Sequence, residues 1–317
     1  MSESLGLPIF DVHCHLPAPG RLAWGAWGEA FARRYGEAKL TTWIERNRQA
    51  QHRSRDTLGF PVPEVPQPSP DESARRYAAE IERYGLRGIC LVTGGGNDVL
   101  AAAIRPHPKL LGFAHHDPFS PGAADELVRA VRDLRLVGYK VIAPALPGPL
   151  ADSTLDPVWE TCSYLGIPVL VHFGPLGGGS GVAAGQNISP LALHDVAKGF
   201  PDTPFIVPHF GTGYLRELLH LMWACDNVFV DTSGSNGWRR FLWPQPELAD
   251  LFRLFHRQFG AERILFGTDS SYFPRGWASR YAEEQLRAAA AAGIQERDVE
   301  KIFATNAPAL LRVETPE

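Results

Sequence analysis

Short apolar runs recur along the chain, and each of them is bounded by Gly, Pro, Asp or Asn. The runs are rich in Val, Ile, Leu and Phe without strict alternation, which is typical of strands that are covered on both faces. They predict eight strands, over residues 8–13, 86–93, 109–114, 136–143, 167–173, 205–208, 228–231 and 264–267.

Stretches with apolar residues at helical spacing separate these strands. They predict helices over residues 71–84, 123–134, 157–165, 190–200, 214–225, 247–259, 278–292 and 297–311. The first helix has a clear start signal, with Ser69 as N-cap, Pro70 at the first helical position and Glu72 completing a capping box.

Strands that alternate with helices indicate parallel βαβ units. Eight such units predict an α/β fold, a (β/α)8 TIM barrel that forms a single domain over residues 1–317. A doubly wound open sheet is the alternative, but it would carry a glycine-rich phosphate-binding signature after the first strand, and the sequence has none there.

The interval between the first two predicted strands is much longer than the others, and the excess lies in residues 16–70. This insertion holds an amphipathic stretch over 29–51 and a proline-rich run over 60–68. We predict a long loop that caps the barrel mouth, since such loops usually carry specificity. An oligomer contact or a surface decoration is the alternative.

Charge and cysteine content limit the classes of function and of binding partner that the sequence allows. The 317 residues carry 31 Lys and Arg against 35 Asp and Glu, a formal net charge of −4, which excludes a polybasic nucleic-acid or lipid surface as the main theme. No apolar run approaches the roughly 20 residues that span a bilayer. The first residues lack the basic region of a secretory signal, and the four cysteines form no CxxC pair, so we expect a cytoplasmic protein. We expect a small-molecule substrate and neither nucleic-acid nor membrane partners, and leave homo-oligomerisation open.

Reactive groups of a barrel enzyme stand at the C-terminal ends of its strands. Histidines and a carboxylate end four of the predicted strands: His13, His15, His172, His209 and Asp269. Residues i and i+2 of a strand point to the same side, so His13 and His15 should face the barrel axis and Cys14 should face away. Converging imidazoles and a carboxylate would be costly to desolvate without a cation. Nitrogen and oxygen ligands suit Zn²⁺, with Fe²⁺, Mn²⁺ or Co²⁺ as alternatives.

Five motifs resemble the amidohydrolase superfamily, in particular its amidohydrolase-2 branch, which is related to aminocarboxymuconate-semialdehyde decarboxylase. They are DVHCH at 11–15, VHFG at 171–174, PHFG at 208–211, FGTD at 266–269 and KIFATNAPALL at 301–311, and the resemblance covers nearly the whole chain apart from the insertion.

The resemblance implies a role for each strand-end residue. His13, His15 and His172 would bind the metal ion. Asp269 would bind the ion, or stand beside it and accept a proton from bound water. His209 would bind a second ion, or orient and polarise the substrate.

Lys140 leaves the number of ions open. In the two-metal members of the superfamily a lysine on strand four is carbamylated and bridges both ions, and Lys140 is placed for that role. In the single-metal branch that this chain resembles most, a lysine at a similar position need not touch the metal. We therefore expect one ion rather than two, with Lys140 carbamylated if there are two.

The expected reaction is hydrolysis of an amide, lactone or ester. A metal ion lowers the pKa of a bound water, Asp269 would take its proton, and His209 would help to polarise a substrate carbonyl. The alternative is a lyase with the same ligand set, a non-oxidative decarboxylase or hydratase acting on a carboxylated, aromatic or muconate-type substrate. A non-catalytic barrel is a third hypothesis, against which the complete ligand set argues.

Four residues are candidates for substrate binding. Arg239 and Arg240 follow strand seven and can clamp a carboxylate, unless they only begin a solvated helix. Trp24 of the insertion can stack on a ring, unless it packs in a small loop core. His115 and His116 end strand three, and one of them should face the mouth, where we favour His116; otherwise it caps a loop.

Overall fold

The computed structural model describes residues 5–17, 25–175 and 185–314. All eight predicted strands are present and parallel to their neighbours. They are β1 (Phe10–Cys14), β2 (Gly88–Leu91), β3 (Leu110–Gly112), β4 (Tyr139–Ile142), β5 (Val169–His172), β6 (Phe205–Val207), β7 (Val228–Asp231) and β8 (Ile264–Leu265).

The strands close into a barrel. β1 to β3 form one sheet and β4 to β8 form another. A bridge between Ala114 and Tyr139 joins β3 to β4, and a bridge between Cys14 and Ser270 joins β1 to the chain that follows β8. The predicted (β/α)8 barrel is confirmed.

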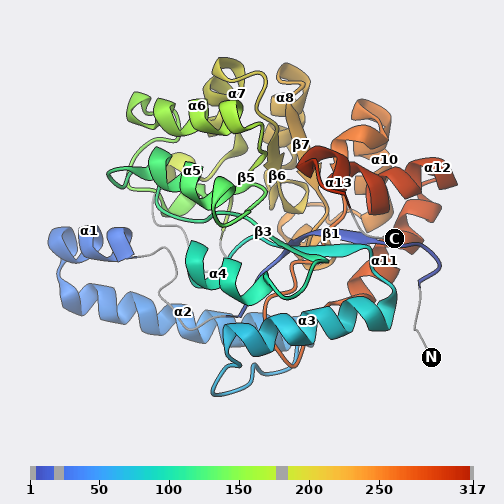
Figure 1. The fold of residues 1–317 in the computed structure, drawn as a ribbon, viewed down its shortest axis with the longest axis horizontal. Helices are drawn as coiled ribbons and strands as arrows, with labels where there is room; N and C mark the ends of the chain where they lie inside the picture. Colours follow the sequence, from blue (N-terminus) through green and yellow to red (C-terminus); the bar gives the residue numbers. More distant parts are fainter. Residues whose placement is uncertain (1–4, 18–24, 176–184, 315–317) are drawn as a thin grey trace.

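Helices surround the strands (Figure 1). They are α3 (Pro70–Tyr84), α4 (Asn97–Ile104), α5 (Ala123–Arg132), α6 (Asp156–Leu165), α7 (His194–Gly199), α8 (Leu215–Ala224), α9 (Ser235–Trp238), α10 (Leu248–Phe259), α11 (Ser279–Ala291), α12 (Glu296–Glu300) and α13 (Asn306–Leu311). The predicted cap of α3 is present, since Ser69 Oγ accepts a hydrogen bond from the Glu72 amide. A π-helical turn separates α12 from α13, where one continuous helix was predicted.

Side chains on the two faces of the strands form two hydrophobic clusters. Leu170 of β5 belongs to the cluster inside the barrel, whereas its neighbours Val169 and Val171 pack in the larger cluster under the helices. Strands buried on both faces explain why the sequence shows continuous apolar runs.

A bulge in β1 turns His13, and His15 directly after the strand, toward the axis. Asp11 pairs with Ile89 and Cys14 pairs with Leu91, so three steps along β1 match two along β2. The extra residue changes the side-chain alternation between Val12, which packs inside the barrel, and Cys14, which packs outside. His13 and His15, on either side of Cys14, therefore face the axis as predicted.

The insertion contains two helices and not only loop. α1 (Gly25–Tyr35) and α2 (Glu37–Leu58) lie at one edge of the molecule in Figure 1. The chain then returns to the barrel, where Glu64 N donates a hydrogen bond to the carbonyl oxygen of Phe273 at 2.9 Å. No helix in the described parts of the chain is long and apolar enough to cross a membrane.

Candidate metal centre

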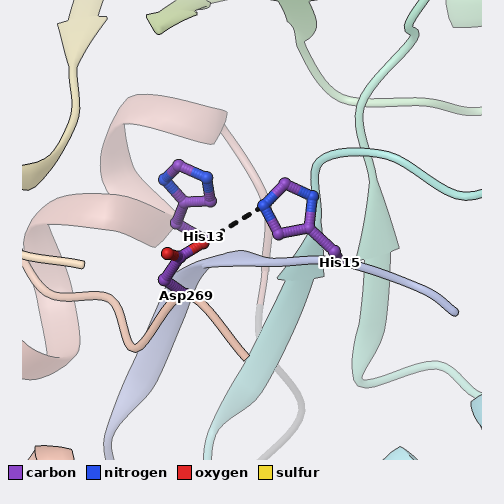
Figure 2. Close-up of side chains that lie close together, drawn as sticks. All are labelled: His13, His15 and Asp269. Atoms are coloured by element: carbon purple, nitrogen blue, oxygen red, sulfur yellow. Dashed lines mark ion pairs between the residues drawn. The ribbon is translucent and has the colours of Figure 1, made fainter. Parts of the chain in front are cut away.

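His13 of β1, His15 directly after this strand and a carboxylate that follows β8 form a candidate metal site at the mouth of the barrel. His13, His15 and Asp269 each offer one ligand atom, and these atoms lie within 4.8 Å of one another. The Oδ1 atom of Asp269 is 3.2 Å from Nε2 of His15 (Figure 2). His13 is buried, whereas the side chains of His15 and Asp269 are 24% and 26% exposed, so the site can be reached from solvent.

Contacts at Nδ1 orient both imidazoles. Nδ1 of His13 is 2.9 Å from Oδ2 of Asp231, and an ionised carboxylate can only accept, so this nitrogen donates. The lone pair of His13 is then on Nε2, as metal binding requires. Nδ1 of His15 is 2.7 Å from Oγ1 of Thr93, which leaves Nε2 toward Asp269.

A second group shares His13. Ligand atoms of His13, His209 and Asp231 also lie within 4.8 Å of one another, and all three residues are buried. Nδ1 of His209 is 2.5 Å from the carbonyl oxygen of Ser233, so it donates and the lone pair is on Nε2. In this form His209 can bind an ion or accept a proton, whereas donation to a substrate carbonyl would need a protonated Nε2.

His172, the third imidazole that the resemblance implies, ends β5 beside His209. Its Nδ1 is 3.2 Å from Nε2 of His209, and the two ring centroids are 5.1 Å apart. Among the described residues His172 belongs to neither group of three. In this structure His172 therefore contacts His209 of the site, and its role as a metal ligand stays a prediction.

The protonation states of the cluster fit a metal site. Burial lowers the pKa of His13 to about 3 and also lowers the pKa of His209. Burial would raise the pKa of Asp231 and Asp269, but the neighbouring His13 and His15 outweigh it and hold both pKa values well below the usual range. Neutral imidazoles and ionised carboxylates are the forms that bind a divalent ion. The residues present therefore fit the metal that the resemblance implies.

Lys140 lies on β4 and is 1% exposed. Burial lowers its pKa to about 8, against the opposing charges of Asp231 and Asp269. An amine with such a pKa is partly neutral near physiological pH, which is the form that reacts with carbon dioxide. Lys140 is thus able to react as the two-metal pattern requires, and its role in a two-ion site stays a prediction.

Two residues of the cluster have unusual backbone conformations. Asp269 has φ 60° and His209 has φ 61°, in the left-handed region that non-glycine residues seldom adopt. Gly234 makes room for the first of them, since a Cβ there would lie 3.0 Å from Oδ2 of Asp269. Such strain persists where surrounding contacts enforce it and is concentrated at functional sites.

A cavity of about 320 Å³ lies beside Asp269. Residues of the insertion and of the loops after β7 and β8 line it. It has aromatic and cationic walls, from Phe60, Trp238, Tyr272, Tyr281, Arg55, Arg240 and Arg275. The described lining residues include three arginines and one carboxylate, that of Asp269, so the cavity favours an anionic ligand.

The residues predicted to bind substrate differ in their positions relative to the cavity. Arg240 lines the cavity. Arg239 points its guanidinium to the carbonyl oxygen of Pro246 and the carboxylate of Glu247, at 2.8 and 3.2 Å. Trp24 lies outside the described residues.

His116 is engaged within the fold. Its Nε2 is 3.0 Å from the carbonyl oxygen of Ala123 and its Nδ1 is 3.4 Å from Nδ2 of Asn97. His115, its neighbour, instead places Nδ1 2.9 Å from the carbonyl oxygen of Lys140. His115 is therefore the member of the pair that lies against the strand carrying Lys140, and substrate contact by His116 stays a prediction.

Sequence reasoning missed Asp231 beside the metal site, and Arg55, Phe60, Tyr272 and Tyr281 in the cavity. Asp231 ends an apolar strand, the same signal that singled out Asp269, and could have been found in this way. Arg55 and Phe60 reach the cavity from the insertion, and no local pattern distinguishes them from the other arginines and aromatic residues of that segment.

The fold and this cluster define a barrel with a candidate site for a divalent ion at the C-terminal ends of its strands. A family model described as amidohydrolase matches residues 10–313. The chain belongs to the amidohydrolase family, in its amidohydrolase-2 branch. No curated protein matches the sequence.

Solved structures share the fold at low identity. An uncharacterised TIM-barrel protein from Bordetella bronchiseptica has a TM-score of 0.65 and 21% identity, with coverage of 96% of this chain and 98% of that one. A 5-carboxyvanillate decarboxylase from Novosphingobium aromaticivorans with bound manganese has a TM-score of 0.63 and 15% identity, with coverage of 99% of this chain and 100% of that one. A probable 2-pyrone-4,6-dicarboxylic acid hydrolase from Acinetobacter baumannii has a TM-score of 0.60 and 14% identity, with coverage of 97% of this chain and 100% of that one. These neighbours include both a decarboxylase and a hydrolase.

Proposed function

We propose that the chain is a metal-dependent hydrolase that cleaves an amide, lactone or ester in a small substrate bearing a carboxylate. One observation carries the proposal: the ligand atoms of His13, His15 and Asp269 converge beside a cavity lined by three arginines. A bound divalent ion would supply a Lewis acid for the substrate carbonyl and would acidify a water molecule.

The residues of the chain do the remaining work. Asp269 takes the proton of the attacking water, because it is ionised and its Oδ1 atom is held beside His15 at the metal site. His209 accepts a hydrogen bond at Nε2 and orients the water or the substrate. Asp269 then returns the proton to the leaving amine or alkoxide.

We propose one ion, and Zn²⁺ as its identity, because two imidazoles and a carboxylate suit that ion. The manganese in the Novosphingobium neighbour makes Mn²⁺ the next ion to test. His172 would supply a third imidazole ligand, as the resemblance implies.

We further propose that residues 16–70 cap the mouth of the barrel. Arg55 and Phe60 line the cavity from this segment, and Trp238 and Arg240 line it from the segment after β7. A carboxylated ring would find both cationic and aromatic partners there.

A non-oxidative decarboxylase is the second candidate, because the same site would hold its carboxylated substrate and a solved structure with this fold is a decarboxylase. Both reactions are tested by incubating the protein, loaded with Zn²⁺ or Mn²⁺, with carboxylated lactones, esters and aromatic acids. We expect a new carboxylate with an alcohol or amine from the lactones and esters. Release of carbon dioxide would identify the decarboxylase instead, and turnover of none of these substrates would contradict both.

A further inference from the structure

Both backbone polar groups of Asp269 are held by hydrogen bonds. Its N–H donates to the carbonyl oxygen of His13 at 2.9 Å, and Nη1 of Arg275 donates to its carbonyl oxygen at 3.0 Å. Since Asp269 has a left-handed backbone at φ 60°, these two bonds oppose its return to a relaxed conformation. The position of its carboxylate beside His15 depends on the same backbone.

Two aromatic rings hold the guanidinium of Arg275. Its Cζ atom is 4.2 Å from the ring centroid of Phe60 and 5.2 Å from that of Tyr281, and the two centroids are 5.8 Å apart. A guanidinium over a ring face is attracted to it electrostatically and loses little further freedom when it makes a hydrogen bond. The rings therefore orient the group that bonds to Asp269.

Phe60 comes from the insertion, and the chain around it is attached to the loop that carries Asp269. The hydroxyl of Tyr272 donates to the carbonyl oxygen of Pro61 at 2.9 Å, and Glu64 N donates to the carbonyl oxygen of Phe273 at 2.9 Å. The insertion is thus fastened at two points to the part of this loop that directly precedes Arg275.

We propose that Phe60 is a positioning residue for the metal site: through Arg275 it holds Asp269 beside His15, so that the insertion sets the affinity of the barrel for its ion. The inference rests on the proposed function, because it takes the metal site as given. It assigns to the insertion a second task besides lining the cavity.

The test is the dissociation constant of Mn²⁺, measured on metal-free full-length protein without substrate from the electron paramagnetic resonance signal of the free ion. Outer partners of ligands typically contribute 10- to 100-fold to metal affinity, and Phe60 acts one contact further out, so we expect Phe60→Ala to weaken binding by about 10-fold. Phe60→Tyr keeps the ring and should bind as the wild type does. Arg275→Gln should weaken binding at least as much as Phe60→Ala.

The combined effect of the two substitutions on Mn²⁺ binding tests whether Phe60 acts through Arg275. If Phe60 acts through Arg275, the double variant should bind Mn²⁺ as weakly as Arg275→Gln alone, and not by the product of the two effects. Tyr164→Ala is the matched control, because it removes the ring 5.5 Å from Cζ of another arginine, Arg132, between α5 and α6. The melting temperature of each metal-free variant verifies that it folds.

Each outcome decides the inference. A dissociation constant of Phe60→Ala equal to that of the wild type, or effects that multiply in the double variant, would overturn it and leave the proposed function intact. A wild-type protein that binds neither Mn²⁺ nor Zn²⁺ would overturn the proposed function and this inference with it.

Discussion

The Nδ1 atom of His13 lies 2.9 Å from Oδ2 of Asp231, although the two residues are 218 positions apart in the chain. β1 and β7 thus contribute a buried imidazole and a buried carboxylate to one pair. A carboxylate behind a ligating histidine fixes its tautomer and raises its basicity. Asp231 is therefore expected to act on the metal through His13, or to bind a second ion directly.

The first prediction concerns this pair. Asp231→Asn should weaken Zn²⁺ binding by about 10- to 100-fold, because the amide holds the His13 tautomer less firmly than the carboxylate. A competing chelator gives the dissociation constant. Asp226→Asn, at an exposed position just before β7, is the control and should bind as the wild type does. Equal affinity in both variants would show that Asp231 has only a structural role.

The second prediction concerns His172. His172→Ala should lose both metal and activity, because the resemblance places a third imidazole ligand at this position. The metal content of the purified variant is measured beside that of His194→Ala, which removes an exposed histidine. Full occupancy in His172→Ala would mean that His172 only supports His209, as in their 3.2 Å contact.

The third prediction concerns proton transfer. Asp269→Asn should reduce turnover by at least about 100-fold, the lower range for a positioned general base, while the protein still folds. Circular dichroism verifies the fold, and a rate near that of the wild type would reject Asp269 as the proton carrier.

Much of this architecture could be predicted from the sequence, because strands buried on both faces leave apolar runs and strand ends leave isolated polar residues. The positions of His13, His15 and Asp269 follow from that logic. The bulge in β1 could not be foreseen, since it arises from pairing with Ile89 and Leu91 of the neighbouring strand β2, which is distant in the sequence. Alternation alone, counted outward from Cys14, still assigned the correct faces to both histidines.

Other features depend on contacts between distant segments. α4 is short and lacks a side-chain cap at Gly96, so no local signal marked it. The two arginines after β7 could not be told apart in the sequence, yet Arg240 lines the cavity while Arg239 turns to Glu247. Phe60 reaches Arg275 only after the insertion has folded back on the barrel.

The fourth prediction concerns acid stability. His256 of α10 is 2.9 Å from Asp298 of α12, and this hydrogen bond lowers the pKa of Asp298 below its ordinary value of 3.8. A carboxyl with a depressed pKa in the folded state contributes stability above its unfolded pKa, and this contribution is lost as the pH falls below it. Urea unfolding from pH 7 to pH 3 should therefore show a steeper loss for the wild type than for Asp298→Asn.

The control for that series is Asp202→Asn, at an exposed position. Its stability should follow the wild-type curve throughout. If Asp298→Asn followed that curve too, the contact between α10 and α12 would contribute nothing to the acid dependence.

The most direct test of the account is metal content per chain, by elemental analysis of protein purified without chelator, with intact mass recorded in bicarbonate. We predict about one equivalent and an unmodified mass for the wild type and for His194→Ala, and little or no metal for His15→Ala. Two equivalents, with a mass gain that is lost on acidification, would instead indicate carbamylated Lys140 and a two-ion site. Full occupancy in His15→Ala, or no metal in the wild type, would contradict the metal site itself.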